Sequence, residues 1–344
     1  MPTKKAGLFG RTRCSPIFNN LPFSLFKHSI MQRLYFLLPL FTALLACKTT
    51  QKVTYPPEQL VPTEKSLVWK VTGNGLKKPS YVYGTIHIIP KKDFDLPESI
   101  RQALEKTQRV AFEIDMKEMT SFRTQLSFMT KAFMAGGKTL RDLLTPEDYT
   151  FVHKKLEDKG LPPTMLERMK PMFLSMMFSS EEGGEGGLNS GNMTSVEMEV
   201  YQVVRKRKLE SAGLETVGYQ MAIFDSIPYE AQAKMLVQSL RSEAGSEKAD
   251  GGESELDRML GLYRAQDINA MQSLMSDEEF GIKTYEDLLL KKRNYNWIPV
   301  MGRMMRDKPT LFAVGAGHLG GINGVLALLR KEGYRVEAEV GNMP

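Results

Sequence analysis

The sequence contains very little cysteine and histidine. Its two cysteines, Cys14 and Cys47, both lie in the first 47 of 344 residues, and only four residues are histidine. The rest of the chain therefore has no disulfide bond and no cysteine metal ligand. A domain of this size can be stable without disulfide bonds, because it is long enough to bury a large apolar core.

Acidic residues are missing from the same N-terminal stretch. Residues 1–47 hold six of the 46 lysines and arginines but no aspartate or glutamate, so 40 basic residues balance 40 acidic residues in the rest of the chain. The net charge of +6 thus belongs to this stretch. Because the remaining body is neutral and has no basic excess to bind phosphate groups, we expect no nucleic-acid partner.

The N-terminal stretch has the pattern of a bacterial lipoprotein signal peptide. After Met31, a short basic segment precedes the apolar run Leu34–Ala43, which is too short to remain in a membrane as a spanning helix. The run ends in LLAC, which resembles a lipobox and predicts cleavage before Cys47 and acylation of its thiol. Residues 1–30 then precede the true start, and residues 31–46 are the signal peptide. The alternative is an uncleaved membrane anchor.

Lipidation also predicts where the protein lies. The lipid would bind the protein to a membrane of the bacterial cell envelope, and Lys48 replaces the aspartate associated with inner-membrane retention. We therefore expect the periplasmic side of the outer membrane. Residues 47–63 comprise the lipidated cysteine and a polar stretch with Pro56 and Pro57, which predicts a tether. Residues 64–344 form the folded domain.

Segments with strand character lie at both ends of this domain, with helical spacing between them. The strands expected from β-branched and aromatic runs are Ser66–Val71, Ser80–His87, Arg109–Asp115, Thr310–Val314 and Tyr334–Val340, with helices at Pro97–Thr107 and Asn323–Glu332. Residues 117–306 read as a mostly helical insertion with polar loops at Glu181–Asn192 and Ser242–Glu255. The sequence thus predicts an α/β (α+β) fold, with a mixed sheet built from the N- and C-terminal sections.

Two of the strands end in the same local motif. In YVYGTIH and in LFAVGAGH, an apolar strand reaches a glycine, and a histidine follows three residues later, at His87 and His318. Open α/β sheets place ligands beyond the carboxyl ends of their strands, so we expect both imidazoles to meet at one metal site. Two buried histidines that bind backbone carbonyls are the alternative. His153, within a helical segment, is expected at the surface.

Two neutral imidazoles need an acidic partner to compensate a divalent cation. In RVAFEID, the alternation of a strand directs Glu113 away from Val110, Phe112 and Ile114, so Glu113 is the expected third ligand. An exposed acid on an edge strand is the alternative interpretation of this residue.

These segments resemble the TraB/GumN family. The YGTIH motif, the E-I-D strand, the segment LETVGYQ and the closing FAVGAGHLGGINGVLALLRKEGYRV carry the resemblance, which extends from Val68 to Val340. The family includes bacterial pheromone-shutdown proteins and is similar to the animal Tiki proteases. The resemblance implies a metal-dependent, peptide hydrolase-like domain whose two G-x-x-H motifs and essential acid are His87, His318 and Glu113. The resemblance also implies that Glu215, Gln220, Arg293 and Asn294 belong to the site, because they match recurring positions of the family.

The expected function is therefore a metal-dependent peptide hydrolase, a metalloprotease that acts on peptides or exported polypeptides. Manganese, cobalt or zinc would be the divalent metal ion, Glu215 would shuttle a proton or orient a ligand histidine, and Gln220, Arg293 and Asn294 would contact the substrate. A non-catalytic envelope lipoprotein that binds haem or a metal is the alternative, followed by an interaction domain without metal. The sequence does not specify the oligomeric state.

Overall fold

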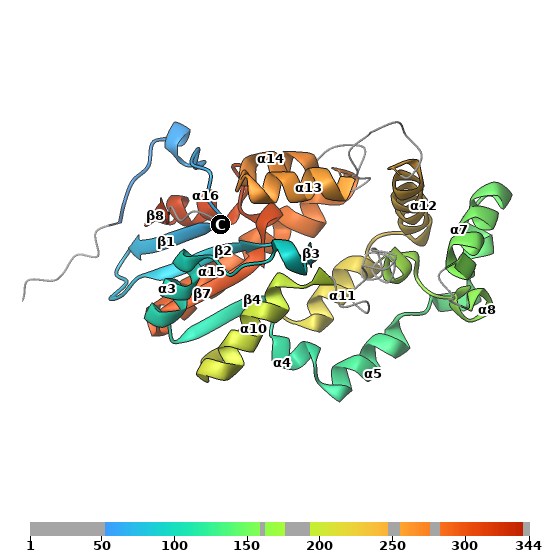
Figure 1. Ribbon diagram of the computed structural model, residues 1–344, viewed down its shortest axis with the longest axis horizontal. Helices are drawn as coiled ribbons and strands as arrows, with labels where there is room; N and C mark the ends of the chain where they lie inside the picture. The colour runs from blue at the N-terminus through green and yellow to red at the C-terminus, as the bar shows by residue number, and fades with distance from the viewer. Residues whose placement is uncertain (1–51, 159–161, 176–192, 247–254, 276–282, 340–344) are drawn as a thin grey trace, which may run out of the picture. The chain divides into compact units, whose positions relative to one another are not determined.

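The computed structural model describes residues 52–158, 162–175, 193–246, 255–275 and 283–339. Its centre is a six-stranded sheet with the strand order β6-β4-β7-β2-β1-β8 (Figure 1). Helices lie between the strands in sequence, so the predicted mixed α/β fold is confirmed. The strands are β1 (Val68–Gly73), β2 (Ser80–Thr85), β4 (Arg109–Ile114), β6 (Glu210–Glu215), β7 (Thr310–Gly315) and β8 (Tyr334–Ala338), and a separate pair joins β3 (Ile89–Pro90) to β5 (Met193–Thr194).

Four neighbouring strands of the sheet run in parallel. β2 pairs with β7, β7 with β4, and β4 with β6, whereas β1 is antiparallel to both of its neighbours. The ends of the parallel strands are aligned, since Thr85 lies opposite Gly315 and Ile114 lies opposite Glu215. These four strand ends form one edge, which we call the carboxyl edge. In parallel sheets, ligand sites form at this edge.

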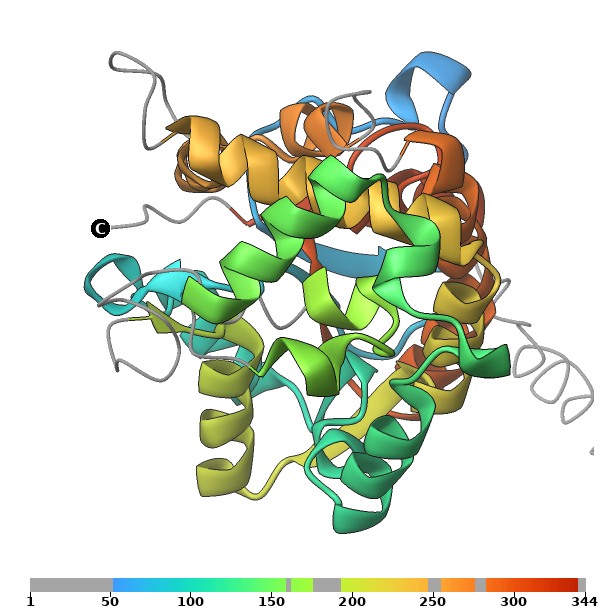
Figure 2. The same ribbon diagram turned by 90° about the vertical axis from the view of Figure 1, so that its right-hand side faces the viewer.

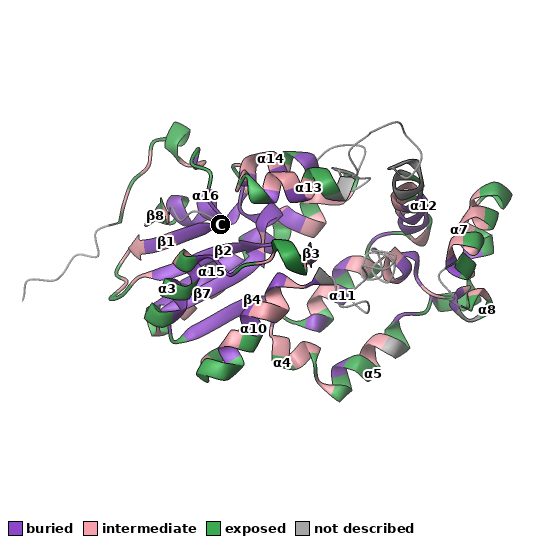
Figure 3. Ribbon diagram, viewed as in Figure 1, coloured by how far each residue is buried: buried purple, intermediate pink, exposed green. Residues whose placement is uncertain are grey.

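The central strands are buried on both faces. Every residue of β2 is buried, as are five of the six residues of β7 (Figure 3). Val82, Phe112 and Phe312 are at most 1% exposed and belong to the main apolar cluster. Continuous apolar runs of this kind are typical of parallel strands covered by helices. The burial fixes the strands in register and thereby fixes the positions of the residues at their ends.

Strand β6 differs from the sequence prediction, which placed residues 117–306 in a mostly helical insertion. Its sequence, ESAGLE, has no β-branched or aromatic residue, so its composition does not favour a strand. It forms because β4 offers an unpaired edge, and Gly213 allows close approach: a Cβ there would lie 2.6 Å from the backbone nitrogen of Asp115. The insertion therefore supplies an edge strand, and Glu215 lies at its carboxyl end.

The helices include both of those expected at the ends of the domain, α3 and α16. Helix α12 also extends into the segment expected to be the second loop, while residues 181–192 lie outside the described residues. The helices are α3 (Glu98–Lys106), α4 (Met116–Met119), α5 (Phe122–Lys131), α6 (Leu140–Leu143), α7 (Pro146–Asp158), α8 (Pro163–Leu166), α10 (Val196–Arg207), α11 (Val217–Asp225), α12 (Tyr229–Ser246), α13 (Glu255–Arg264), α14 (Ile268–Met275), α15 (Lys292–Asp307) and α16 (Val325–Lys331).

Some helices of the insertion have an apolar cluster of their own. Leu140, Val152, Leu166 and Leu236, from α6, α7, α8 and α12, are at most 2% exposed and pack together. Of these helices, the green α7 lies nearest the viewer in Figure 2. This cluster is distinct from the main cluster that includes the sheet. The insertion is therefore stabilised by local burial as well as by its strand β6.

Part of the segment expected to be a tether contacts the domain. Val53 donates a backbone hydrogen bond to Gly333 at 3.0 Å, and Arg330 donates to the carbonyl of Gln59 at 2.8 Å. The guanidinium of Arg330 also lies 5.0 Å from the ring centre of Tyr55. These contacts hold residues 53–59 against α16 and the turn before β8. The polar composition of residues 47–63 had instead predicted a tether without contacts to the domain.

Among the described residues, no helix has both the length and the apolar character needed to cross a membrane. The predicted signal peptide and Cys47 lie outside the described residues.

The first G-x-x-H motif depends on a close approach at its glycine. A Cβ at Gly84 would lie 2.8 Å from Cδ1 of Leu319 and 3.1 Å from Cβ of Ala316. Both neighbours are buried in the segment that contains the second motif. Gly84 therefore lets the end of β2 pack directly against the turn that presents His318.

Candidate active site

Four of the predicted residues lie at the carboxyl edge. Glu113 is the second-last residue of β4, Glu215 ends β6, and His318 lies in the short helical turn Ala316–His318 after β7. His87 follows β2 by two residues. The sequence motifs predicted positions at this edge for the histidines and Glu113, whereas Glu215 lies there because β6 is a strand of the sheet. Within the described part of the chain, His87 makes no side-chain hydrogen bond to Glu113 or His318; its side-chain hydrogen bond is to Glu197.

The guanidinium of Arg293 lies between the two carboxylates. Its Nη2 atom is 2.5 Å from Oε2 of Glu113 and 2.7 Å from Oε1 of Glu215, and Nη1 lies 3.2 Å from Nε2 of His318. Arg293 comes from α15, and its side chain is 8% exposed. One buried cation thus joins three of the predicted residues, and the two carboxylates with the guanidinium carry a net charge of −1.

Glu215 is held by two donors. Besides Arg293, the indole Nε1 of Trp297 donates to its Oε2 at 2.9 Å. The Trp297 ring lies 4.5 Å from the His318 ring and 4.9 Å from the Arg293 guanidinium. Glu215 is 4% exposed at its side chain. Its hydrogen bonds position the Arg293 guanidinium and the Trp297 ring, which lies beside His318.

The second motif places the backbone against Glu113. The amide of Gly315 donates to Oε1 of Glu113 at 2.9 Å, and a Cβ at Gly315 would lie 3.3 Å from the same oxygen. Each carboxylate oxygen of Glu113 therefore accepts one hydrogen bond, from Gly315 or from Arg293. Each oxygen keeps a further lone pair.

Asn294 fixes the tautomer of His318. Its Nδ2 atom donates to the carbonyls of His318 at 3.3 Å and Asn323 at 2.9 Å, so its Oδ1 faces Nδ1 of His318 as an acceptor at 2.6 Å. This assignment places the proton of neutral His318 on Nδ1 and leaves a lone pair on Nε2. The Nε2 atom lies 3.8 Å from Oε1 of Glu113.

Glu197 plays the same part for His87. Its Oε1 atom lies 2.9 Å from Nδ1 of His87 and accepts from Thr85 at 2.7 Å, and its Oε2 accepts from Ser195 at 3.0 Å. The sequence analysis did not identify Glu197. The detectable signal was a helix start of the form S-x-E, in which Ser195 caps α10. Both histidines thus present Nε2, because a side-chain oxygen binds Nδ1 in each.

The electrostatics distinguish the two histidines. Burial and the Arg293 charge outweigh Glu113 and lower the pKa of His318 to about 3, so its imidazole is neutral at pH 7. His87, three-quarters exposed at its side chain, has a raised pKa because of the Glu197 carboxylate. Burial raises the pKa of Glu113, but the Arg293 cation and, more weakly, the charge of His87 and the amide of Gly315 hold it well below its usual range.

The remaining predicted residues lie apart from these contacts. Gln220 is half-buried on α11, and its side chain makes no hydrogen bond within the described part of the chain. His153 lies on α7 with Nδ1 3.5 Å from Glu157. Its partial exposure agrees with the surface position expected from the sequence.

The donor chemistry fits a divalent cation, although the side chains do not already enclose one. Across the described residues, no group of three or more His, Asp or Glu side chains stands together at metal-binding geometry. Nε2 of His318, which accepts a hydrogen bond from Nη1 of Arg293, nevertheless lies 3.8 Å from Oε1 of Glu113, beside a cluster of net negative charge. Imidazoles oriented through Nδ1 by protein oxygens are the usual surroundings of metal-ligating histidine.

The comparisons with known proteins agree with this arrangement. A sequence profile of the TraB/PrgY/gumN family matches residues 67–338, so the chain belongs to this family. The match begins at β1 and ends with β8, and it includes every residue of the candidate site. No solved structure is significantly similar to this chain.

Curated relatives are animal proteins named as metalloproteases. The chain is 23% identical to Metalloprotease TIKI1 of Danio rerio over 330 residues, 81% of this chain and 64% of that protein. It is 23% identical to Metalloprotease TIKI1 of Homo sapiens over 329 residues, 81% of this chain and 63% of that protein. The chain thus spans less than two thirds of the length of these relatives.

Proposed function

We propose that this protein is a metal-dependent peptide hydrolase whose centre is the carboxyl edge of the sheet. The observation that carries the proposal is the matched anchoring of His87 and His318: a side-chain oxygen binds Nδ1 of each, so a metal would be bound through Nε2, which in His318 accepts a hydrogen bond from Arg293 in this structure. Glu113, the acid between them in sequence, lies 3.8 Å from His318 and has a pKa well below its usual range. Similarity to animal metalloproteases supports the same class of reaction.

In this proposal His87, His318 and Glu113 hold the divalent cation. When bound, manganese, cobalt or zinc would polarise a scissile carbonyl and lower the pKa of a bound water toward about 7. Arg293 supplies the fixed positive charge of the site, and its Nη1 faces the same space as Nε2 of His318. Its other contacts show that this charge compensates the carboxylates of Glu113 and Glu215.

Glu215, Glu197 and Asn294 hold Arg293 and the two histidines in position. Glu215 binds both Arg293 and Trp297, which favours a role in holding the guanidinium over the proton shuttle expected from the sequence. Asn294 donates both amide hydrogens to backbone carbonyls and accepts from His318, which favours an orienting role over substrate contact. Glu197 orients His87.

The setting of the activity is a further part of the proposal. We infer that Cys47 is lipidated and that the protein acts on peptides or exported polypeptides at the periplasmic side of the outer membrane. The support is the apolar run that ends in LLAC.

Purified full-length protein tests the reaction directly. With a peptide library, we expect cleavage only when manganese, cobalt or zinc is present, its loss on chelation, and its return when metal is added back. Mass spectrometry of the products identifies the bonds cut, and His153→Ala should cleave at the parental rate. Metal or haem uptake without cleavage of any library member would contradict the hydrolase proposal and favour the binding lipoprotein.

A substitution at Glu197 tests the proposed orientation of His87. Glu197→Gln keeps the size of the side chain but removes the charge that binds Nδ1, so the affinity for divalent metal should fall by about 10–100-fold. Calorimetric titration with each metal measures this change. The matched control is Glu157→Gln, which removes the carboxylate of the other His–Glu pair, at His153. Equal metal affinity in both variants would exclude an orienting role for Glu197.

A further inference from the structure

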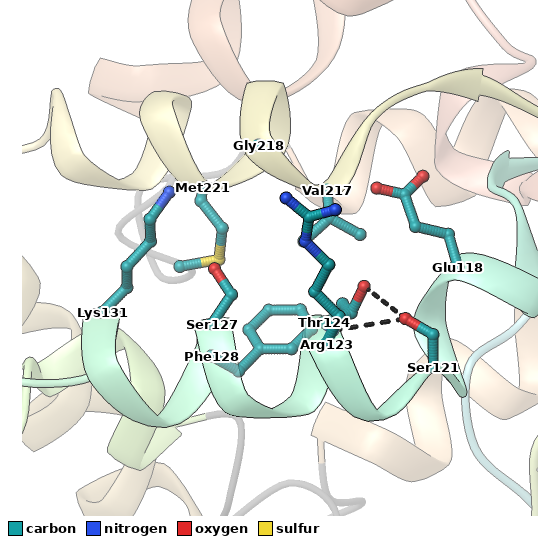
Figure 4. Close-up of a pocket in the computed structure, with 10 residues that line it drawn as sticks. All are labelled: Glu118, Ser121, Arg123, Thr124, Ser127, Phe128, Lys131, Val217, Gly218 and Met221. Atoms are coloured by element: carbon teal, nitrogen blue, oxygen red, sulfur yellow. Dashed lines mark hydrogen bonds between the residues drawn. The ribbon is translucent and has the colours of Figure 1, made fainter.

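A pocket lies between α5 and α11 (Figure 4). Its volume is about 360 Å³. Phe128 lies at its centre, and Val217, Gly218 and Met221 line it from α11. None of the roles assigned above uses this pocket.

The pocket adjoins the carboxyl ends of strands β4 and β6. Ile114 and Glu215 are paired at the ends of β4 and β6, and Val217 follows Glu215 by two residues. Ile114, Val217 and Met221 form a single apolar cluster, against which Phe128 packs. The apolar floor of the pocket is therefore continuous with the strand that carries Glu113.

The rim of the pocket carries positive charge. Arg123 and Lys131 line it from α5, whose sequence FRTQLSFMTK contains no acidic residue. Neither cation has an acidic side chain within ion-pair distance in the described part of the chain. Glu118 is the single acid among the lining residues, and Asp225 at the end of α11 is paired with Lys170. This local excess contrasts with the balanced charge of the body.

The two cations are separated by the apolar centre of the pocket. Arg123 and Lys131 are eight positions apart on one helix, a rise of about 12 Å. Figure 4 shows Arg123 directed toward Val217, Lys131 beside Met221, and Phe128 between them. This arrangement is complementary to an apolar side chain flanked by carboxylates.

We propose that the pocket is a substrate-binding subsite that selects an acidic polypeptide segment, with an apolar residue on Phe128 and Met221 and acidic residues beside Arg123 and Lys131. Its role as a substrate subsite rests on the proposed hydrolase function, whereas the binding itself does not. The selection is electrostatic at the rim and hydrophobic at the floor. It should therefore weaken as salt is added, because exposed ion pairs are screened.

Binding of fluorescein-labelled peptides to the full-length protein in the presence of EDTA tests the subsite without cleavage. A peptide with a central Glu-Leu-Glu should bind about fourfold tighter than the same peptide with Gln-Leu-Gln, since each of the two exposed ion pairs contributes a factor of about two. The double variant Arg123→Gln/Lys131→Gln should lose this preference with an unchanged melting temperature. The matched control Lys77→Gln/Lys78→Gln removes two exposed lysines from the turn between β1 and β2 and should retain it.

The possible outcomes test the subsite proposal and the hydrolase proposal independently. Equal binding of the two peptides by the parent protein, or an unchanged preference in the double variant, would overturn the subsite. Cleavage of acidic and neutral peptides with the same kcat/KM would overturn it as well, while the hydrolase proposal stands. A preference abolished by the double variant, in a protein that cleaves no peptide with any metal, would support the binding site and contradict the hydrolase proposal.

Discussion

Replacing Arg293 by methionine should lower the free energy of unfolding by about 3–5 kcal/mol, because it leaves two buried carboxylates without their cation. Glu113 and Glu215 both bind the same Nη2 atom, and their side chains are 14% and 4% exposed. Urea-induced unfolding followed by tryptophan fluorescence measures the loss. Trp297 lies against the substituted side chain, so its emission reports directly on this region.

Two further variants show whether the loss is electrostatic. Adding Glu113→Gln and Glu215→Gln to Arg293→Met should recover much of the stability, because the uncompensated charges are gone. Arg303→Met is the matched control: it is an exposed arginine on the same helix, and we expect a change of at most about 0.5 kcal/mol. An Arg293→Met variant as stable as the Arg303→Met control would show that the cation does not hold the two acids.

Removing either motif histidine should have the largest effect on metal content and activity. His87→Ala and His318→Ala each delete one proposed ligand, so each should lower metal affinity by more than the loss of about 10–100-fold expected for an orienting residue such as Glu197. Elemental analysis of protein purified without chelator measures the content, and peptide cleavage measures kcat/KM. Cleavage should fall to a similar extent in both variants.

The double variant distinguishes a shared site from two separate ones. If the histidines act as a unit, His87→Ala/His318→Ala should be little worse than either single change. His153→Ala controls for the loss of an imidazole elsewhere on the molecule and should keep full metal content. Independent, multiplicative losses in the double variant, or full metal occupancy in His318→Ala, would show that the two motifs do not form one centre.

The sequence by itself determined five of the six strands of the sheet and the histidines that follow two of them. The apolar runs Arg109–Ile114 and Thr310–Gly315 both form strands. Their β-branched and aromatic side chains pack on both faces of a parallel sheet, which is why such runs predict buried strands. The repeated strand-glycine-histidine motif then placed His87 and His318 at the same edge. Local chemistry and short spacings were sufficient for these predictions.

Tertiary structure decided which side chains surround the two motifs. The ESAGLE segment becomes strand β6 through pairing with β4, and this pairing brings Glu215 within reach of Arg293. Glu197 and Asn294 bind Nδ1 of His87 and His318 across 110 and 24 positions of sequence, which no local pattern encodes. The physical reason is that hydrogen bonds and ion pairs depend on distance in space, whereas propensity and periodicity describe only neighbours along the chain.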